Sequence, residues 1–98
     1  MTDWSSGDIV ANGITLHYQR TGGAKPPLVL AHGLTDNGLC WTPVVQRLAQ
    51  DYDCILVDAR GHGKSTALAQ GYTNAEHAAD YAGLIRALNL VKPVMLGQ

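Results

Sequence analysis

The chain has 98 residues, enough for one small domain with a modest hydrophobic core. Its hydrophobic content of 46% and charged content of 15% are those of an ordinary globular protein and exclude a disordered one. A net charge of −1, with the basic residues scattered, excludes the clustered positive surface that nucleic acids and anionic membranes require in a partner.

Cysteine usage and the first residues indicate a cytoplasmic protein. Cys40 and Cys54 form no Cys-x-x-Cys pair, so we expect two reduced thiols and neither a disulfide nor a metal site. Residues 1–7 have neither the basic nor the apolar region of a signal peptide. The apolar runs are too short to cross a bilayer, and no residue cluster predicts a metal or another cofactor.

The first predicted element is a β-hairpin whose strands are residues 8–11 and 14–20. Between them, Asn12-Gly13 readily takes the positive φ angles of a two-residue type I′ turn. His17, in the second strand, is expected to face solvent. Glycines and prolines in residues 21–27 then interrupt the chain before the next element.

Three short apolar runs, at residues 28–31, 53–58 and 94–96, predict further strands. Their continuous apolar character is typical of strands that are buried between helices on both faces of a parallel sheet. We therefore expect all three to be buried.

Two helices are predicted between these strands. The first has Thr42 as its cap and Pro43 in its first turn. Its expected core-facing residues are Val44, Val45, Leu48 and Ala49. Before the second helix, Thr73 and Glu76 have the spacing of a capping box, in which each side chain accepts from the other residue's backbone N–H. The expected buried stripe of that helix, which should end near residues 89–92, is Ala78, Tyr81, Ala82, Ile85 and Leu88.

This order of elements predicts an α/β protein, with an antiparallel hairpin followed by parallel strands that crossover helices connect. The carboxyl ends of parallel strands share one edge of the sheet, and ligands bind beyond that edge in open sheets. We therefore expect three segments to meet at one site: residues 32–34, 58–65 and 97–98.

The segment His32-Gly33-Leu34 is the predicted substrate-binding turn. Gly33 lets the backbone bend close to a substrate and leaves the next N–H, that of Leu34, free to point at a developing oxyanion. His32 is expected to orient the backbone, since no candidate nucleophile lies beside it in the sequence. A strand-terminating turn without a function is the alternative for this segment.

Residues 58–65, called the 58–65 loop below, are expected to be mainly architectural. Gly61 and Gly63 suit a tight turn with positive φ, while Asp58 and Ser65 can bond to neighbouring backbone groups. Arg60 can pair with a carboxylate. Ser65 is a poor candidate nucleophile, because no strained turn presents its hydroxyl.

The same loop leaves nucleotide binding open as an alternative, because Gly63-Lys64-Ser65 ends like a phosphate-binding P-loop. In that pattern the first glycine would fall on Asp58, whose negative charge would repel a triphosphate. A dinucleotide fingerprint would need a third glycine at Thr66. Nucleotide binding is therefore the less favoured function for this loop.

Together these residues resemble the α/β-hydrolase superfamily along essentially the whole chain. The resemblance rests on residues 29–34, 57–65 and 95–98, the last of which match the approach to a Gly-x-Ser-x-Gly nucleophile turn. It implies a serine hydrolase that cleaves an ester, thioester, amide or carbon–carbon bond through an acyl-enzyme. It also implies that Leu34 supplies one oxyanion-hole N–H, and that His32 and the 58–65 loop are structural.

The resemblance further implies that nucleophile, acid and base, in this order, all follow Gln98. We therefore expect residues 1–98 to be the N-terminal segment of one domain, inactive alone. Its expected partners are a small-molecule acyl substrate and the remainder of that domain. Thr35 stands where epoxide hydrolases and haloalkane dehalogenases usually carry proline, which favours a serine over an aspartate nucleophile. A truncated module without catalytic activity is the non-enzyme alternative.

Overall fold

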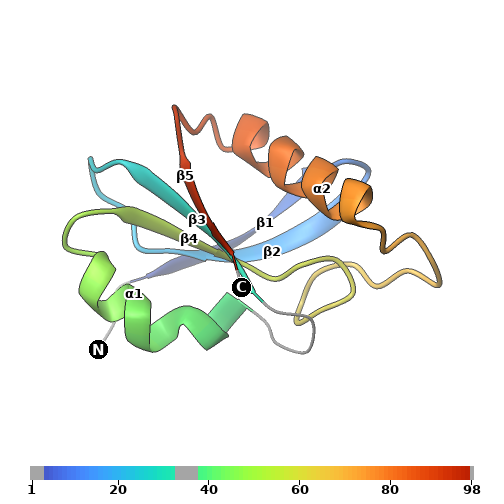
Figure 1. Cartoon of the computed structure of the whole chain (residues 1–98), viewed down its shortest axis with the longest axis horizontal. Coiled ribbons are helices and arrows are strands. Elements are labelled where there is room, and N and C mark those ends of the chain that lie inside the picture. The colour runs from blue at the N-terminus through green and yellow to red at the C-terminus, as the bar shows by residue number, and fades with distance from the viewer. Residues whose placement is uncertain (1–3, 33–37, 98) are drawn as a thin grey trace.

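The computed structural model describes residues 4–32 and 38–97 as one sheet between two helices (Figure 1). In chain order the elements are β1 (Ser5–Ala11), β2 (Ile14–Arg20), β3 (Pro27–Ala31), the 3-10 helix η1 (Gly38–Trp41), α1 (Thr42–Leu48), β4 (Asp53–Val57), α2 (Asn74–Ala87) and β5 (Val94–Gly97). This order confirms the predicted α/β class. No helix in these described ranges is long and apolar enough to span a bilayer.

The sheet has the strand order β1-β2-β4-β3-β5. β1 pairs with β2, and β2 with β4, in antiparallel fashion, whereas β3 pairs in parallel with both β4 and β5. The hairpin turn has the predicted positive φ angles, 52° at Asn12 and 79° at Gly13. The carboxyl ends of β3, β4 and β5 therefore lie at one edge, as expected.

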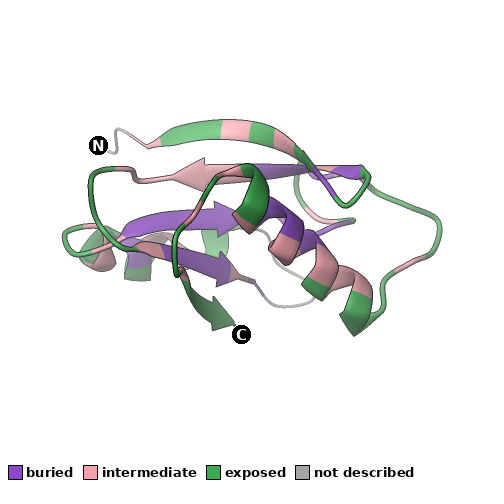
Figure 2. Cartoon of the chain, turned by 90° about the horizontal axis from the view of Figure 1, so that it is seen from above, coloured by how far each residue is buried: buried purple, intermediate pink, exposed green. Residues whose placement is uncertain are grey.

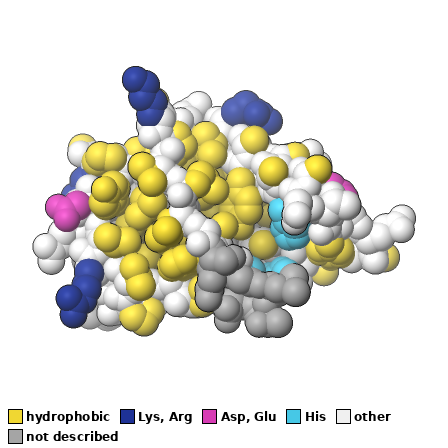
Figure 3. All heavy atoms as spheres, in the orientation of Figure 1, with side chains coloured by type: hydrophobic (Ala, Val, Ile, Leu, Met, Phe, Trp, Pro, Cys, Tyr) yellow, Lys and Arg dark blue, Asp and Glu magenta, His cyan; other side chains and the backbone are white. Residues whose placement is uncertain are grey.

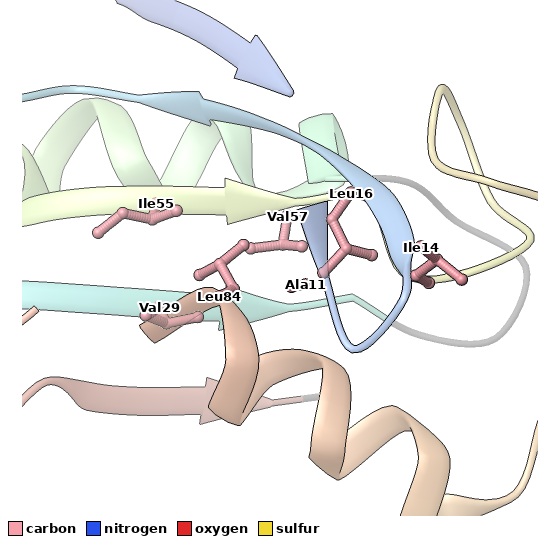
Figure 4. Close-up of a cluster of buried hydrophobic side chains, with 7 residues drawn as sticks. All are labelled: Ala11, Ile14, Leu16, Val29, Ile55, Val57 and Leu84. Atoms are coloured by element: carbon pink, nitrogen blue, oxygen red, sulfur yellow. The ribbon is translucent and has the colours of Figure 1, made fainter. Parts of the chain in front are cut away.

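The parallel strands bury alternate side chains on the two faces of the sheet, so each face has its own core. The face toward α2 carries a cluster of seven buried residues, drawn in Figure 4: Ala11, Ile14, Leu16, Val29, Ile55, Val57 and Leu84. The face toward α1 carries Leu28, Leu30, Val45, Cys54 and Leu56. At Gly83, α2 comes so close to the hairpin that an added Cβ would lie 3.1 Å from the Cβ of Ala11.

The predicted faces of both helices need correction. In α1, Val45 is fully buried, as predicted, but Val44 is 45% exposed. The residue in the N-cap position is Trp41 and not Thr42. The Thr42 hydroxyl instead donates to the Leu39 carbonyl. The cause is η1, which begins the helical path before residue 42 and sets the rotation of the short α1. No reading of residues 42–49 alone would reveal that turn.

In α2, the Thr73 hydroxyl accepts from the Glu76 N–H at 3.2 Å, so this half of the predicted capping box is confirmed. The buried stripe is rotated from the predicted one. Its centre holds Asp80, Gly83 and Leu84, and Ala78, predicted to be buried, is exposed. Tyr81, Ile85 and Leu88 are partly buried at its side.

The prediction that the last strand is buried was wrong. All residues of β5 are exposed, with Val94 at 51%, Met95 at 45% and Leu96 at 37% (Figure 2). β5 is the edge strand of the described sheet, and neither core cluster includes any of its residues. Apolar side chains accordingly gather on the face of the molecule that carries β5 (Figure 3).

Candidate functional site

The predicted site lies at the edge of the sheet where β3 and β4 end. His32 directly follows β3, and the 58–65 loop directly follows β4. The predicted oxyanion residues Gly33 and Leu34 lie outside the described residues, as does Gln98. The described part of the site is therefore His32, the 58–65 loop and Gly97, which pairs with Ala31 at the end of β5.

His32 is buried and bonds to the backbone of the 58–65 loop. Only 8% of it is exposed, and its Nε2 accepts from the backbone N–H of Ala59 at 2.9 Å. A nitrogen that accepts a hydrogen bond carries no proton, so the proton of the neutral ring lies on Nδ1. This bond joins the segments that follow β3 and β4, and it occupies one of the two ring nitrogens.

His62 lies against His32 from the other side of the loop. The two ring centroids are 5.0 Å apart, and the planes meet edge to face at 66°. The Nδ1 of His62 donates to the backbone carbonyl of Arg60 at 2.9 Å. The His62 ring of the loop therefore contacts His32, the residue that follows β3.

Asp58 and Gly63 form the inside of the loop. The Asp58 carboxylate accepts from the Lys64 N–H at 3.0 Å. Gly63 has a φ of +51°, and an added Cβ there would overlap this carboxylate. A triphosphate in this loop would have to displace the Asp58 carboxylate from the Lys64 N–H, so the geometry gives no support to the nucleotide alternative.

Ser65 and Thr66 tie the loop to β2. The Ser65 hydroxyl accepts from the His17 N–H at 2.8 Å and donates to the Asp58 carbonyl. Thr66 and Thr15 exchange backbone and side-chain bonds at 2.9 to 3.2 Å. Ser65 is 8% exposed, and its hydroxyl both accepts and donates a hydrogen bond, as expected for a residue that holds the loop.

Arg60 pairs with a carboxylate, as its place in the loop suggested. Its Nε and Nη2 donate to the two carboxylate oxygens of Asp80 at 2.6 and 2.7 Å. Its Nη1 donates to Glu76 at 3.2 Å and to the Gly71 carbonyl. The bonds to Asp80 raise the pKa of Arg60 above its ordinary value, and desolvation opposes this shift to a lesser degree.

Sequence reasoning missed Asp80 as a member of this site. It is 2% exposed in the middle of α2 and also accepts from the side-chain amide of Asn12 at 3.0 Å. Its signal was present: Glu76 and Asp80 are four positions apart, hence on one helical face, and both contact Arg60. This spacing places the two carboxylates on one face of the helix, but it does not identify Arg60 as their partner.

The expectation that His17 faces solvent was wrong. It is 8% exposed, and its Nδ1 lies 2.8 Å from the carboxylate of Asp8, the residue opposite it in β1. It lies there because the 58–65 loop folds over this part of β2. A cavity of about 180 Å³ beside the loop is lined by His17, Gln19, Leu39, Asp58, Gly63 and Lys64.

Two further groups near the cores have raised pKa values. Burial raises the pKa of Tyr81 to about 12, and the nearby Asp80 and Asp58 carboxylates add to the shift. Burial also raises the pKa of the Cys54 thiol, whereas Cys40 is exposed.

Within residues 4–32 and 38–97, no group of three His, Cys, Asp or Glu side chains is placed to hold a metal ion.

The sequence matches known proteins along most of its length. A model of the alpha/beta hydrolase fold family matches residues 26–98. The chain is 38% identical over 84 residues to 2-(acetamidomethylene)succinate hydrolase of Mesorhizobium japonicum, covering 86% of this chain and 30% of that protein. It is 35% identical over 94 residues to N-formylmaleamate deformylase of Pseudomonas putida, covering 95% and 35%.

Solved structures agree with the sequence matches. N-formylmaleamic acid deformylase from Pseudomonas putida S16 has a TM-score of 0.88 and 32% identity, over 96% of this chain and 36% of that one. A haloalkane dehalogenase variant from Bradyrhizobium elkanii has a TM-score of 0.89 and 25% identity, over 98% and 32%. The chain thus spans about a third of the length of the relatives it matches.

Proposed function

Because the chain belongs to the α/β-hydrolase fold family, we propose that it is the N-terminal segment of a serine hydrolase that works through an acyl-enzyme. The observation that carries the proposal is the joining of two loops at the carboxyl edge of the sheet. His32, after β3, is bonded to the start of the 58–65 loop, after β4, at the place where open α/β sheets bind ligands.

In the proposed site, Leu34 donates its backbone N–H to the oxyanion, and Gly33 gives the substrate room beside the backbone. The support is the fixed position of His32, whose ring is held by the Ala59 N–H immediately before this turn. An oxyanion donor is effective when it needs no reorganisation during the reaction. Asp58, Arg60, Gly61, Gly63 and Ser65 have the structural role of holding the loop.

The proposed substrate is a small N-acylated acid, whose amide C–N bond is cleaved. The names of two relatives contain an acetamido or formyl group on a small acid, and these proteins are 38% and 35% identical to this chain. The acyl carbon would form a bond to a serine oxygen while the amine leaves with a proton, and water would then release the acid. Serine, acid and base are proposed to follow Gln98.

Fluorophosphonate labelling with intact-mass measurement tests this function. We expect the 98-residue chain, of 10.4 kDa, to remain unlabelled and to hydrolyse N-formylmaleamate no faster than buffer. A longer protein that contains this chain and has the length of its relatives should take up one label and release formate. Turnover by the 98-residue chain that is lost on Ser65→Ala or His32→Ala would contradict the proposed roles.

A binding module without catalysis is the second candidate, and the exposed apolar strand β5 is the observation that favours it. Absence of label in the longer protein, together with a folded monomer, would support this candidate. In either case the proposed partners are a small molecule and the rest of the domain, not nucleic acid or membrane. The proposed location is the cytoplasm.

A further inference from the structure

We propose that Asp80 is a positioning residue for His32, acting through the guanidinium of Arg60. The two residues lie on α2 and at the end of β3, on separate elements of the fold. The catalytic consequence of this coupling rests on the function proposed above, since His32 precedes the proposed oxyanion donor. The coupling itself is a property of described contacts.

The first link is the contact between Asp80 and Arg60. Two parallel N–H···O bonds of 2.6 and 2.7 Å join the two planar groups, a geometry that fixes orientation as well as distance. The Asp80 side chain is 2% exposed and that of Arg60 is 4% exposed, so water does not compete for these bonds. A paired contact of this kind holds the Arg60 side chain in one position.

The second link runs from the backbone of Arg60 to His32. Ala59, immediately before Arg60, donates its N–H to the His32 ring. His62, two residues after Arg60, bonds to the Arg60 carbonyl and places its own ring edge to face against His32. These two contacts of the loop with His32 therefore flank the residue that Asp80 holds.

Asp80 is better suited to this role than the other partners of Arg60. Glu76 contacts Arg60 through one oxygen at 3.2 Å, and its side chain is 40% exposed. Gly71 offers only a neutral carbonyl. Asp80 is in addition held by Asn12, so its carboxylate bonds to the hairpin turn as well as to the loop.

The coupling can be measured without any enzyme assay, by amide hydrogen exchange and histidine ¹⁵N NMR on the chain. The measured quantity is the ratio of two hydrogen-exchange protection factors, that of the Ala59 N–H divided by that of the Ile55 N–H in the middle of β4. A global loss of stability lowers both factors equally, so it leaves this ratio unchanged. For Asp80→Asn we expect this ratio to fall about tenfold, as the loop opens locally. The His32 ring should then show both tautomers instead of the Nδ1–H form alone.

The control is Asp53→Asn, which disrupts the partly exposed Arg20–Asp53 pair at the opposite end of β4. This variant should leave the Ala59 ratio within about twofold of the unchanged chain. Asp80→Glu, which keeps a carboxylate, should restore most of the protection. An unchanged ratio in Asp80→Asn, or an equal fall in Asp53→Asn, would overturn the proposal.

If Asp80→Asn does not fold, Arg60→Lys decides the question, because it keeps the charge and loses the paired contact. The same fall of the ratio supports the coupling, and an unchanged ratio overturns it. These outcomes are independent of the proposed function, since fluorophosphonate labelling can succeed or fail whatever the exchange ratio does.

Discussion

The two ends of β4 carry the same kind of ion pair in different surroundings. At the amino end, Asp53 accepts three bonds of 2.6 to 3.1 Å from Arg20. At the carboxyl end, Arg60 donates two bonds to Asp80. The bonds to the aspartate raise the pKa of both arginines.

The difference lies in how far water reaches each pair. The Arg20 side chain is 28% exposed, whereas that of Arg60 is 4% exposed. Arg20 can therefore be solvated when its partner is lost, and Arg60 cannot. The amino-end pair joins β2 to β4 near the surface of the sheet. The carboxyl-end pair lies in the interior of the candidate site.

The largest expected effect is that of Asp80→Ala. It leaves the Arg60 guanidinium buried with the half-exposed Glu76 as its remaining charged partner among residues 4–32 and 38–97. We expect the free energy of unfolding to fall by about 3–5 kcal/mol, the usual cost of breaking a buried pair. Urea unfolding followed by circular dichroism measures it. If Asp80→Ala lowers the free energy of unfolding no more than Asp53→Ala does, the difference in burial between the two pairs has no effect on stability.

Gly63→Ala should have the next largest effect. The added methyl group must adopt a φ of +51° and overlaps the Asp58 carboxylate, so we expect a loss of about 2–4 kcal/mol. Gly22→Ala is the matched variant near the amino end, where φ is +81° but no atom lies within 4 Å of the new Cβ. It should lose about 1 kcal/mol in the same unfolding experiment. Equal losses would mean that the overlap at Gly63 relaxes freely.

Asp53→Ala is expected to cost less, about 1–2 kcal/mol of unfolding free energy. Arg20 turns to water in this variant, and the Gly22 N–H loses its 2.9 Å bond to the carboxylate. Salt sharpens the comparison, since screening acts on exposed charges more than on buried ones. Raising the salt concentration should weaken the amino-end pair of the unchanged chain more than the carboxyl-end pair.

The smallest effect concerns alkaline pH and Tyr81. Below about pH 10 this phenol is neutral in both the folded and the unfolded chain, so it does not alter stability. Between pH 10 and its folded pKa of about 12, the unfolded chain loses the proton first, so stability falls as pH rises. Tyr81→Phe should therefore show a flatter decline of the urea midpoint in this range. A parallel decline in both proteins would place the pKa of Tyr81 near its ordinary value.

Local sequence signals predicted the scaffold of this molecule well. Asn12-Gly13 fixed the hairpin because few other pairs take two positive φ angles without strain. The polar and glycine residues of the 58–65 loop indicated a self-bonded turn, and Asp58, Gly63 and Ser65 form one. These predictions depend on neighbours in sequence, where propensity is informative.

The failures concern contacts between distant segments. Asp80 was absent from the predicted stripe of α2 because its burial depends on Arg60, which lies twenty positions away. His17 was expected to face solvent, but the 58–65 loop covers this part of β2. β5 and β4 are both short, mainly apolar strands, yet β5 is an edge strand of the described sheet and β4 is central. Periodicity and composition do not contain this information.

The side chains of Asp58, Arg60 and Ser65 bond within the 58–65 loop or to neighbouring elements, which distinguishes them from one position of the loop that is open to change. Lys64 uses only its backbone N–H to hold the turn, while its exposed side chain borders the cavity beside the loop. A directed-evolution library at this single position could therefore reverse or remove a charge at the cavity wall without disturbing the framework. The charge at the cavity wall and the stability of the fold are, at this position, separately adjustable.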